Sequence, residues 1–175
     1  YYTPDGYWNG AVWMPHQWFF WKTMLDLGEA DHAWKIAQTG LDVWEHETRL
    51  TNNCYEHFMV QTGRGAGWHQ FSGLSAPVLC WFATYFRPGR LTTGFDAWVE
   101  DIEVNDAKSQ LRATINLQGK SERKPTLVVC LNTASKPNIT WDGQPVKVSE
   151  RIPGAYEVTL PSGVGRGTLQ CGEAG

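Results

Sequence analysis

The spacing of apolar residues predicts helices in the first half of the chain. Apolar residues recur at helical intervals from Val12 to Leu27, and Gly28 follows them as a helix C-cap would. This segment is apolar almost all round, so it predicts a buried helix. From about Glu29 to Glu47 the apolar residues keep to one face, which predicts an amphipathic outer helix.

A long loop and a third helix are expected next. Residues 50–71 are rich in Asn and Gly and have no sustained period, so they predict a loop, and loops of this length are often functional. The third helix is expected to start near Ser75, whose hydroxyl would cap it with Pro77 in the first turn. The Arg-Pro-Gly sequence at 87–89 would end this helix.

From about Phe95 the pattern changes to short strands. Seven runs alternate partly between apolar and polar residues, namely 98–104, 111–118, 126–131, 138–141, 145–149, 156–160 and 167–171. Asp142-Gly143 predicts a type I′ hairpin turn, because both residues accept a positive φ. The expected fold class is α+β, with helices over residues 1–94 and a small antiparallel β-sandwich over residues 95–175.

Aromatic residues are concentrated in the predicted helical part. Nine of the ten Trp, all seven Phe, five of the six Tyr and all five His lie between Tyr1 and Trp98. Asn, Gln, His, Arg and Glu are interleaved with them, which suits a surface that stacks on ring-shaped ligands and bonds their edges. The alternative is that these aromatic residues only fill a core.

Charge and cysteine content argue against several classes of protein. A net charge of −3 without a Lys/Arg cluster disfavours nucleic acid and anionic membranes as partners. No apolar run approaches the roughly 20 residues that span a bilayer, so we expect a soluble protein, with the bacterial cytoplasm and periplasm both open. The four Cys lack metal-site spacing, so we expect no metal and no cofactor. Cys130 and Cys171 would form either a disulfide or two buried thiols.

Residues 7–18 form the first candidate site. A backbone that contains glycine beside Trp8 and Trp13 allows indole faces to line a pocket. Asn9, His16 and Gln17 are able to bond hydroxyl groups there. The competing interpretation makes the Trp side chains core residues and His16 a hydrogen-bonded core histidine.

The second candidate site lies in the predicted loop, over residues 52–58 and 63–70. Glu56 is the candidate general base, because a carboxylate in an aromatic, Asn-lined loop has its pKa set by limited solvation and fixed hydrogen bonds. Arg64 would orient that carboxylate or bond substrate. Both residues also fit plain loop positions. His57 and His69 lack metal-ligand spacing and are interpreted as hydrogen-bonding residues.

The order of motifs resembles glycoside hydrolase family 63. YWNGAVW, an amphipathic helix, CYEHF and GRGAGWHQFSGLSAPVL together are similar to the closing part of that family's catalytic (α/α)6 barrel, over roughly residues 1–95. The family includes processing α-glucosidase and bacterial glucosidase and mannosylglycerate hydrolase relatives. Asn9 and Ala11 depart from the Arg and Pro that are usual in the first motif, which puts the substrate contacts in question more than the fold.

The resemblance implies the last helices of an (α/α)6 toroid in an inverting glycosidase that acts on α-glucosides or related small sugars. Glu56 would be the general base of this enzyme. The expected sugar-binding residues are Tyr7, Trp8, Asn9, Trp13, His16, Tyr55, Arg64, Trp68, His69 and Gln70.

Such a barrel has more helices than this chain supplies, and its general acid, an Asp, lies upstream of these motifs. The chain therefore predicts the C-terminal part of a larger glycosidase, inactive alone, with a carbohydrate substrate. Its partner would be the remaining N-terminal part of the barrel, in cis or as another chain. Asp5 is a weaker candidate for the acid, since a Pro-Asp-Gly turn explains it. The alternative function is a noncatalytic carbohydrate-binding or protein-interaction module.

Overall fold

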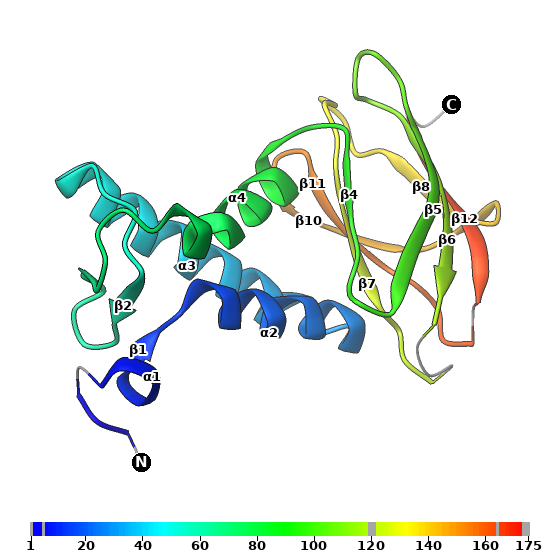
Figure 1. Cartoon of the computed structure of the whole chain (residues 1–175). Coiled ribbons are helices and arrows are strands. Elements are labelled where there is room, and N and C mark those ends of the chain that lie inside the picture. Colours follow the sequence, from blue (N-terminus) through cyan, green and yellow to red (C-terminus); the bar gives the residue numbers. More distant parts are fainter. Residues whose placement is uncertain (1, 5, 119–121, 164, 173–175) are drawn as a thin grey trace. The chain divides into compact units, whose positions relative to one another are not determined.

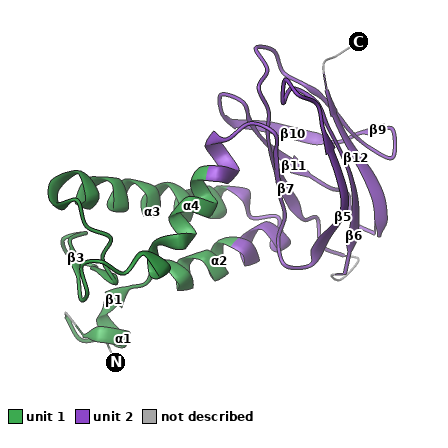
Figure 2. Cartoon of the chain, turned by 45° about the horizontal axis from the view of Figure 1, so that its top comes forward, with its two compact units in different colours: residues 1–21, 31–82 green, residues 22–30, 83–175 purple. Residues whose placement is uncertain are grey.

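The computed structural model describes residues 2–4, 6–118, 122–163 and 165–172 (Figure 1). Two compact units interleave along the sequence. Unit 1 comprises residues 1–21 and 31–82, and unit 2 comprises residues 22–30 and 83–175 (Figure 2). The chain contains helices and antiparallel sheets, so the predicted mixed α+β class is confirmed. The expected domain boundary after residue 94 stays a prediction.

Helices and one small sheet make up the N-terminal half of the chain. The elements are α1 (Tyr7–Gly10), β1 (Ala11–Val12), α2 (Met14–Leu27), α3 (Ala30–Thr51), β2 (His57–Met59), β3 (Gly65–Ala66) and α4 (Ser72–Phe86). The three strands form an antiparallel sheet in the order β1-β2-β3. Residues 50–71 are thus not one loop, since two strands lie inside them. These strands are too short to produce an alternating pattern in the sequence.

α2 ends where the sequence predicts, and its two sides differ in burial. Gly28 has a φ of +77° and its amide donates to the Leu25 carbonyl, as a C-cap residue does. Phe19 and Phe20 are more than half exposed, whereas Trp21 is buried. The described residues therefore bury only one side of this helix. None of the described helices is both long and apolar enough to cross a bilayer.

α4 begins about one turn earlier than expected. It starts at Ser72, and Leu74 donates its amide to the Phe71 carbonyl at the start of the helix. Ser75 therefore lies inside the helix, where its buried hydroxyl has no partner among the described residues, so the predicted cap is wrong. Pro77 also lies inside the helix, where it has no amide hydrogen to donate.

A close contact between α3 and α4 forms the centre of unit 1. Gly40 of α3 faces the indole of Trp81, and a Cβ at this position would lie 2.4 Å from the ring. Trp21 meets Trp81 edge-on, with ring centroids 6.4 Å apart. Both indoles are fully buried. The glycine thus allows a large aromatic side chain to fill the space between helices.

Two antiparallel sheets form most of unit 2. One has the order β10-β11-β7-β4, and the other has the order β5-β6-β12-β8-β9. The strands are β4 (Arg90–Thr92), β5 (Ala97–Val104), β6 (Leu111–Leu117), β7 (Thr126–Cys130), β8 (Asn138–Trp141), β9 (Gln144–Pro145), β10 (Lys147–Ile152), β11 (Ala155–Thr159) and β12 (Arg166–Gly172). All seven expected runs contain strands, the run 145–149 being divided between β9 and β10. The sequence pattern missed β4.

Both sheets of unit 2 contribute to one hydrophobic core. Val129 and Val158 from one sheet and Ile115 and Leu169 from the other are fully buried in the same cluster, as in a β-sandwich. The turn between β8 and β9 has positive φ at both Asp142 and Gly143, which confirms the predicted hairpin turn.

The two buried cysteines of unit 2 are free thiols. Cys130 and Cys171 are both buried and unbridged, so the second of the two expected alternatives holds. Burial raises the pKa of the Cys130 thiol to about 11. It raises the pKa of Cys171 to about 12. Neither thiol is therefore ionised at neutral pH.

The last turn of α2 is bonded to the segment that precedes β5, within unit 2. The Asp26 carboxylate accepts hydrogen bonds from the amides of Phe95 and Asp96, at 2.8 and 3.1 Å. The Lys22 ammonium donates to the Thr93 carbonyl. Burial raises the pKa of Asp26 against the lowering effect of its two amide bonds.

Candidate active site

Glu56 lies immediately before β2, and both of its carboxylate oxygens accept hydrogen bonds. The Tyr7 hydroxyl donates to Oε1. The Trp68 amide donates to Oε2 at 3.1 Å, while the Glu56 amide donates to the Trp68 carbonyl at 2.9 Å. Groups from α1 and from the segment after β3 therefore converge on one carboxylate.

These contacts favour the ionised form of Glu56. The hydrogen bond from Tyr7, then the Trp68 amide and the nearby His57, lower the pKa of the Glu56 carboxyl. The same bond raises the pKa of Tyr7, because the phenol is held as a donor beside a negative charge. Glu56 is therefore a carboxylate at neutral pH and is able to accept a proton, as a general base must.

An aromatic cluster surrounds the Tyr7 side of the site. Trp8 stacks on Trp13 with ring centroids 4.0 Å apart and an interplanar angle of 11°. Tyr7 stands edge-on to both Trp13 and His57, at 4.8 and 5.3 Å. Trp13 is buried and its indole donates to the Tyr7 carbonyl at 3.0 Å, whereas 63% of Trp8 is exposed. The buried indole thus supports one that faces solvent.

A second exposed indole follows a glycine beside Glu56. Gly67 has a φ of +73°, and a Cβ at this position would lie 2.6 Å from Glu56 Oε2. Only glycine accommodates both this backbone and this close approach. The next residue, Trp68, is 66% exposed. Trp8 and Trp68 are therefore both largely exposed indoles of this site.

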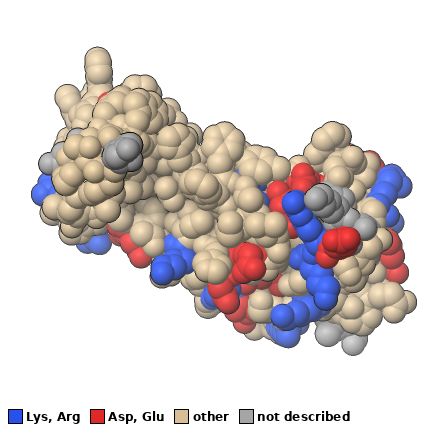
Figure 3. Space-filling model, turned by 90° about the horizontal axis from the view of Figure 1, so that it is seen from below, with Lys and Arg blue, Asp and Glu red and all other residues tan. Residues whose placement is uncertain are grey.

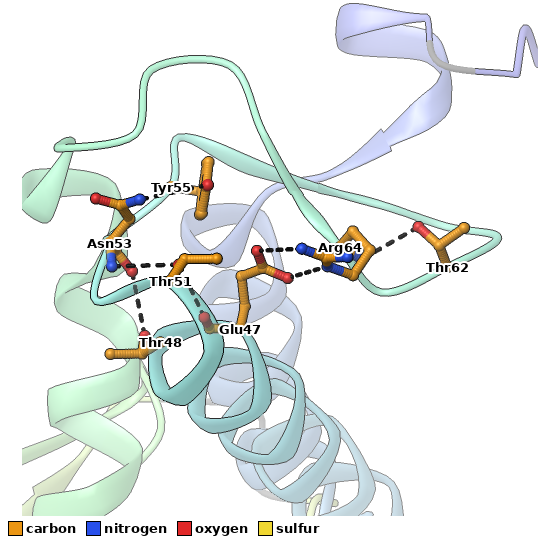
Figure 4. Close-up of polar contacts among 7 residues, drawn as sticks. All are labelled: Glu47, Thr48, Thr51, Asn53, Tyr55, Thr62 and Arg64. Atoms are coloured by element: carbon orange, nitrogen blue, oxygen red, sulfur yellow. Dashed lines mark hydrogen bonds and ion pairs between the residues drawn. The ribbon is translucent and has the colours of Figure 1, made fainter.

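Arg64 pairs with Glu47 (Figure 4). Its guanidinium makes two bonds, Nε to Oε2 at 2.6 Å and Nη2 to Oε1 at 3.2 Å. Glu47 is buried near the end of α3, and the Arg64 bonds hold the pKa of its carboxyl below the ordinary value. In the structure the Arg64 guanidinium thus anchors the β2–β3 segment to α3, and its bonded carboxylate is that of Glu47.

The remaining predicted site residues differ in their contacts. The Asn9 amide donates to the Thr3 hydroxyl at 3.2 Å. His16 is exposed and its ring lies 5.6 Å from that of Trp8. Asn53 donates to the Tyr55 hydroxyl at 3.4 Å, as Figure 4 shows.

His69 and Gln70 are positioned by their backbone. The Cys54 amide donates to the His69 carbonyl at 3.1 Å, and Cys54 forms an isolated parallel bridge with Gln70. Both predicted side chains are exposed. The structure therefore brings Tyr7 and Trp68 to Glu56 and packs Trp8 and Trp13 against Tyr7. The sugar-binding roles of all the named residues stay predictions.

Sequence reasoning missed Glu47 and Gly67. The sequence pattern marked Glu47 only as the last residue of an amphipathic helix. Its partner Arg64 follows 17 residues later. No local spacing indicates such a pair. Gly67 belongs to the glycine-rich GRGAG sequence, which was the available signal for a close approach to a neighbouring side chain. Among the residues that the structure describes, no group of three or more His, Cys, Asp or Glu side chains gathers as a metal site would.

The comparison with known families concerns this same part of the chain. Residues 1–72 match the family model described as the mannosylglycerate hydrolase MGH1-like glycoside hydrolase domain. This match makes the N-terminal part of the chain similar to the MGH1-like glycoside hydrolase domain. The match contains Tyr7, Glu56 and Trp68, and it confirms the resemblance to a family 63-like glycosidase. No curated protein and no solved structure matches the chain.

Proposed function

We propose that the protein is part of an inverting glycoside hydrolase that acts on α-glucosides or related small sugars, with Glu56 as its general base. One observation carries the proposal. Within the residues that match a glycoside hydrolase domain, both oxygens of Glu56 accept hydrogen bonds, next to Trp68, whose indole is exposed. This combination of a fixed carboxylate and an exposed indole suits a sugar-hydrolysing site.

In the proposed reaction Glu56 removes a proton from a water molecule as the water attacks the anomeric carbon. A separate acid protonates the leaving oxygen from the opposite side of the sugar, and the two carboxyl groups of inverting enzymes lie roughly 6.5–9.5 Å apart. Tyr7 and the Trp68 amide hold the base in one orientation, while Trp8 and Trp68 stack on sugar faces. Asp5, the weaker candidate for the acid, lies outside the described residues.

The remaining part of an (α/α)6 barrel, in cis or as another chain, is the proposed source of the acid. Exposed apolar side chains on α2 and α4 support this, among them Phe19, Phe20, Leu79 and Phe82. Most of the surface of unit 1 seen in Figure 3 is uncharged, whereas charges of both signs gather over unit 2. Surfaces of this kind usually mark an interface. The β-sandwich over residues 95–175 is proposed to be accessory and without catalytic groups.

The stereochemistry of the product tests this function. We expect the intact natural protein to hydrolyse an aryl α-glucoside and to release β-glucose first, because attack by water from the opposite face inverts the anomeric centre. Proton NMR distinguishes the two anomers before they equilibrate. Release of α-glucose would contradict the inverting mechanism, and sugar binding without any hydrolysis would favour a noncatalytic carbohydrate-binding module.

A further inference from the structure

His57 carries a buried ring nitrogen that has no partner among the residues that the structure describes. The residue is only 7% exposed, and its Nδ1 neither donates nor accepts a hydrogen bond among the described residues. Buried polar atoms nearly always have a partner, and leaving one without a partner destabilises the folded state. An imidazole that served only to fill this aromatic cluster would be replaced without loss by a phenyl ring.

This nitrogen lies close to the carboxylate of Glu56. A Cβ built on Gly67 would lie 2.9 Å from His57 Nδ1 and 2.6 Å from Glu56 Oε2, so both atoms lie close to one point beside the glycine. Tyr7 and Trp13 contact the imidazole ring, with centroids 5.3 and 5.0 Å away. Glu56 Oε2 accepts the Trp68 amide, and a carboxylate oxygen retains capacity for a second donor.

We propose that His57 is a second ligand-binding residue of the Glu56 site, whose Nδ1 bonds a hydroxyl group that Glu56 also contacts. The hydroxyl belongs either to a water molecule or to a bound sugar, and both offer one donor and an acceptor oxygen. This inference rests on the proposed function, since it concerns the same site. A Cβ on Gly67 would clash with both side chains, so glycine is what allows Glu56 Oε2 and His57 Nδ1 to lie this close to the backbone, and the neighbouring rings hold the imidazole in place.

Three variants of the intact natural protein test the proposal. His57→Phe keeps an aromatic ring and removes the nitrogen, whereas His57→Asn offers an amide group near the position of Nδ1. His46→Phe makes the same change at an exposed histidine of α3 and serves as the control. The measurements are the melting temperature without sugar, and kcat and KM for an aryl α-glucoside.

We expect His57→Phe to melt no lower than the unaltered protein, since it removes an unsatisfied polar atom. We also expect its kcat/KM to fall by about tenfold or more, while His57→Asn and His46→Phe stay within about threefold of the unaltered protein. A rise in KM alone identifies a sugar hydroxyl, and a fall in kcat at constant KM identifies the water. The contrast between stability and activity is a signature that a purely structural histidine does not give.

Several results would overturn the assignment. One is an unchanged kcat/KM in His57→Phe. Another is an equal loss of kcat/KM in His57→Phe and His57→Asn, which would assign the effect to the ring rather than to Nδ1. If His57→Phe does not fold, the test is the ¹⁵N chemical shift of His57 Nδ1 in the unaltered protein. The proposal requires this shift to change when glucose or mannose is added. Inverting hydrolysis with no effect at His57 leaves the proposed function standing and removes only this contact. Absence of both hydrolysis and sugar binding rejects both.

Discussion

At the scale of single residues, the candidate site depends on the two donors that hold Glu56. The Trp68 donor is a backbone amide, which a substitution of that side chain leaves in place. The Tyr7 donor is a side-chain hydroxyl, and its bond is the largest cause of the lowered pKa of Glu56. Tyr7 is therefore the residue through which a single substitution changes the acidity of the proposed base.

Removing the Tyr7 hydroxyl is expected to move the acidic limb of the pH–activity profile to higher pH. The bond favours ionised Glu56, so in Tyr7→Phe the pKa of Glu56 rises and the active, ionised form is lost at a higher pH. The pH dependence of kcat/KM in the intact natural protein measures this. Tyr2→Phe removes an exposed hydroxyl that accepts a bond from Gln61 and is the control. An unmoved acidic limb in Tyr7→Phe would show that this bond does not set the acidity of the base.

The sequence indicated the residues of this site but not their pairing. Tyr7 and Glu56 each lie in a motif that resembles family 63, yet 49 positions separate them. A hydrogen bond over this distance depends on how α1 meets the small sheet, and local spacing carries no information on it. For the same reason the sequence did not indicate that Arg64 pairs with Glu47.

At the scale of elements, the Arg64–Glu47 pair fastens β3 to α3. Glu47 is buried and Arg64 is about half exposed, so the carboxylate would be left without charged donors if the pair were broken. The segment fastened in this way carries Glu56 at one end and Trp68 at the other. The pair is therefore structural support for the site.

Glu47→Gln is expected to lower the free energy of unfolding at neutral pH by about 1.5–3 kcal/mol, the usual contribution of hydrogen bonds to charged groups. Glu45→Gln breaks only an exposed ion pair with Arg49, so we expect it to change the free energy of unfolding by less than about 0.5 kcal/mol. Urea denaturation of the two variants measures both values.

This stabilisation has a definite pH dependence. The pKa of Glu47 is lower in the folded state than the ordinary value of 4.5, so the contribution is complete above that pH. It is lost as the pH falls from there through the folded-state pKa. The free energies of unfolding of Glu47→Gln and of the unaltered protein should therefore differ less at acidic pH than at neutral pH. A difference that stayed constant, or that was already absent at neutral pH, would contradict the structural role of the pair.

Elements with a regular period were predictable, and elements without one were not. The amphipathic pattern of α3 and the alternating runs of unit 2 locate those elements, since one face of each is buried. β2, β3 and β4 have only two or three residues and left no alternation to detect. Pro77 was expected in the first turn of the third helix, whereas it lies in the interior of α4.

At the scale of the whole molecule, the family match and the two compact units divide the chain in similar ways. Residues 1–72 match a glycoside hydrolase domain and include most of unit 1, whereas unit 2 is mainly β-structure after Ala83. The apolar pattern of α2 shows that this surface is to be covered but not by which residues, and Phe19 and Phe20 are exposed on it. The barrel proposal accounts for this surface.

The most direct test of the central claim is the turnover of Glu56→Gln in the intact natural protein. This substitution keeps the shape of the side chain and removes the proton acceptor. We expect kcat to fall by roughly 10²-fold or more, with sugar affinity nearly unchanged, and Glu45→Gln to remain fully active. Near-normal turnover of a correctly folded Glu56→Gln protein would show that Glu56 is not the base and would contradict the account.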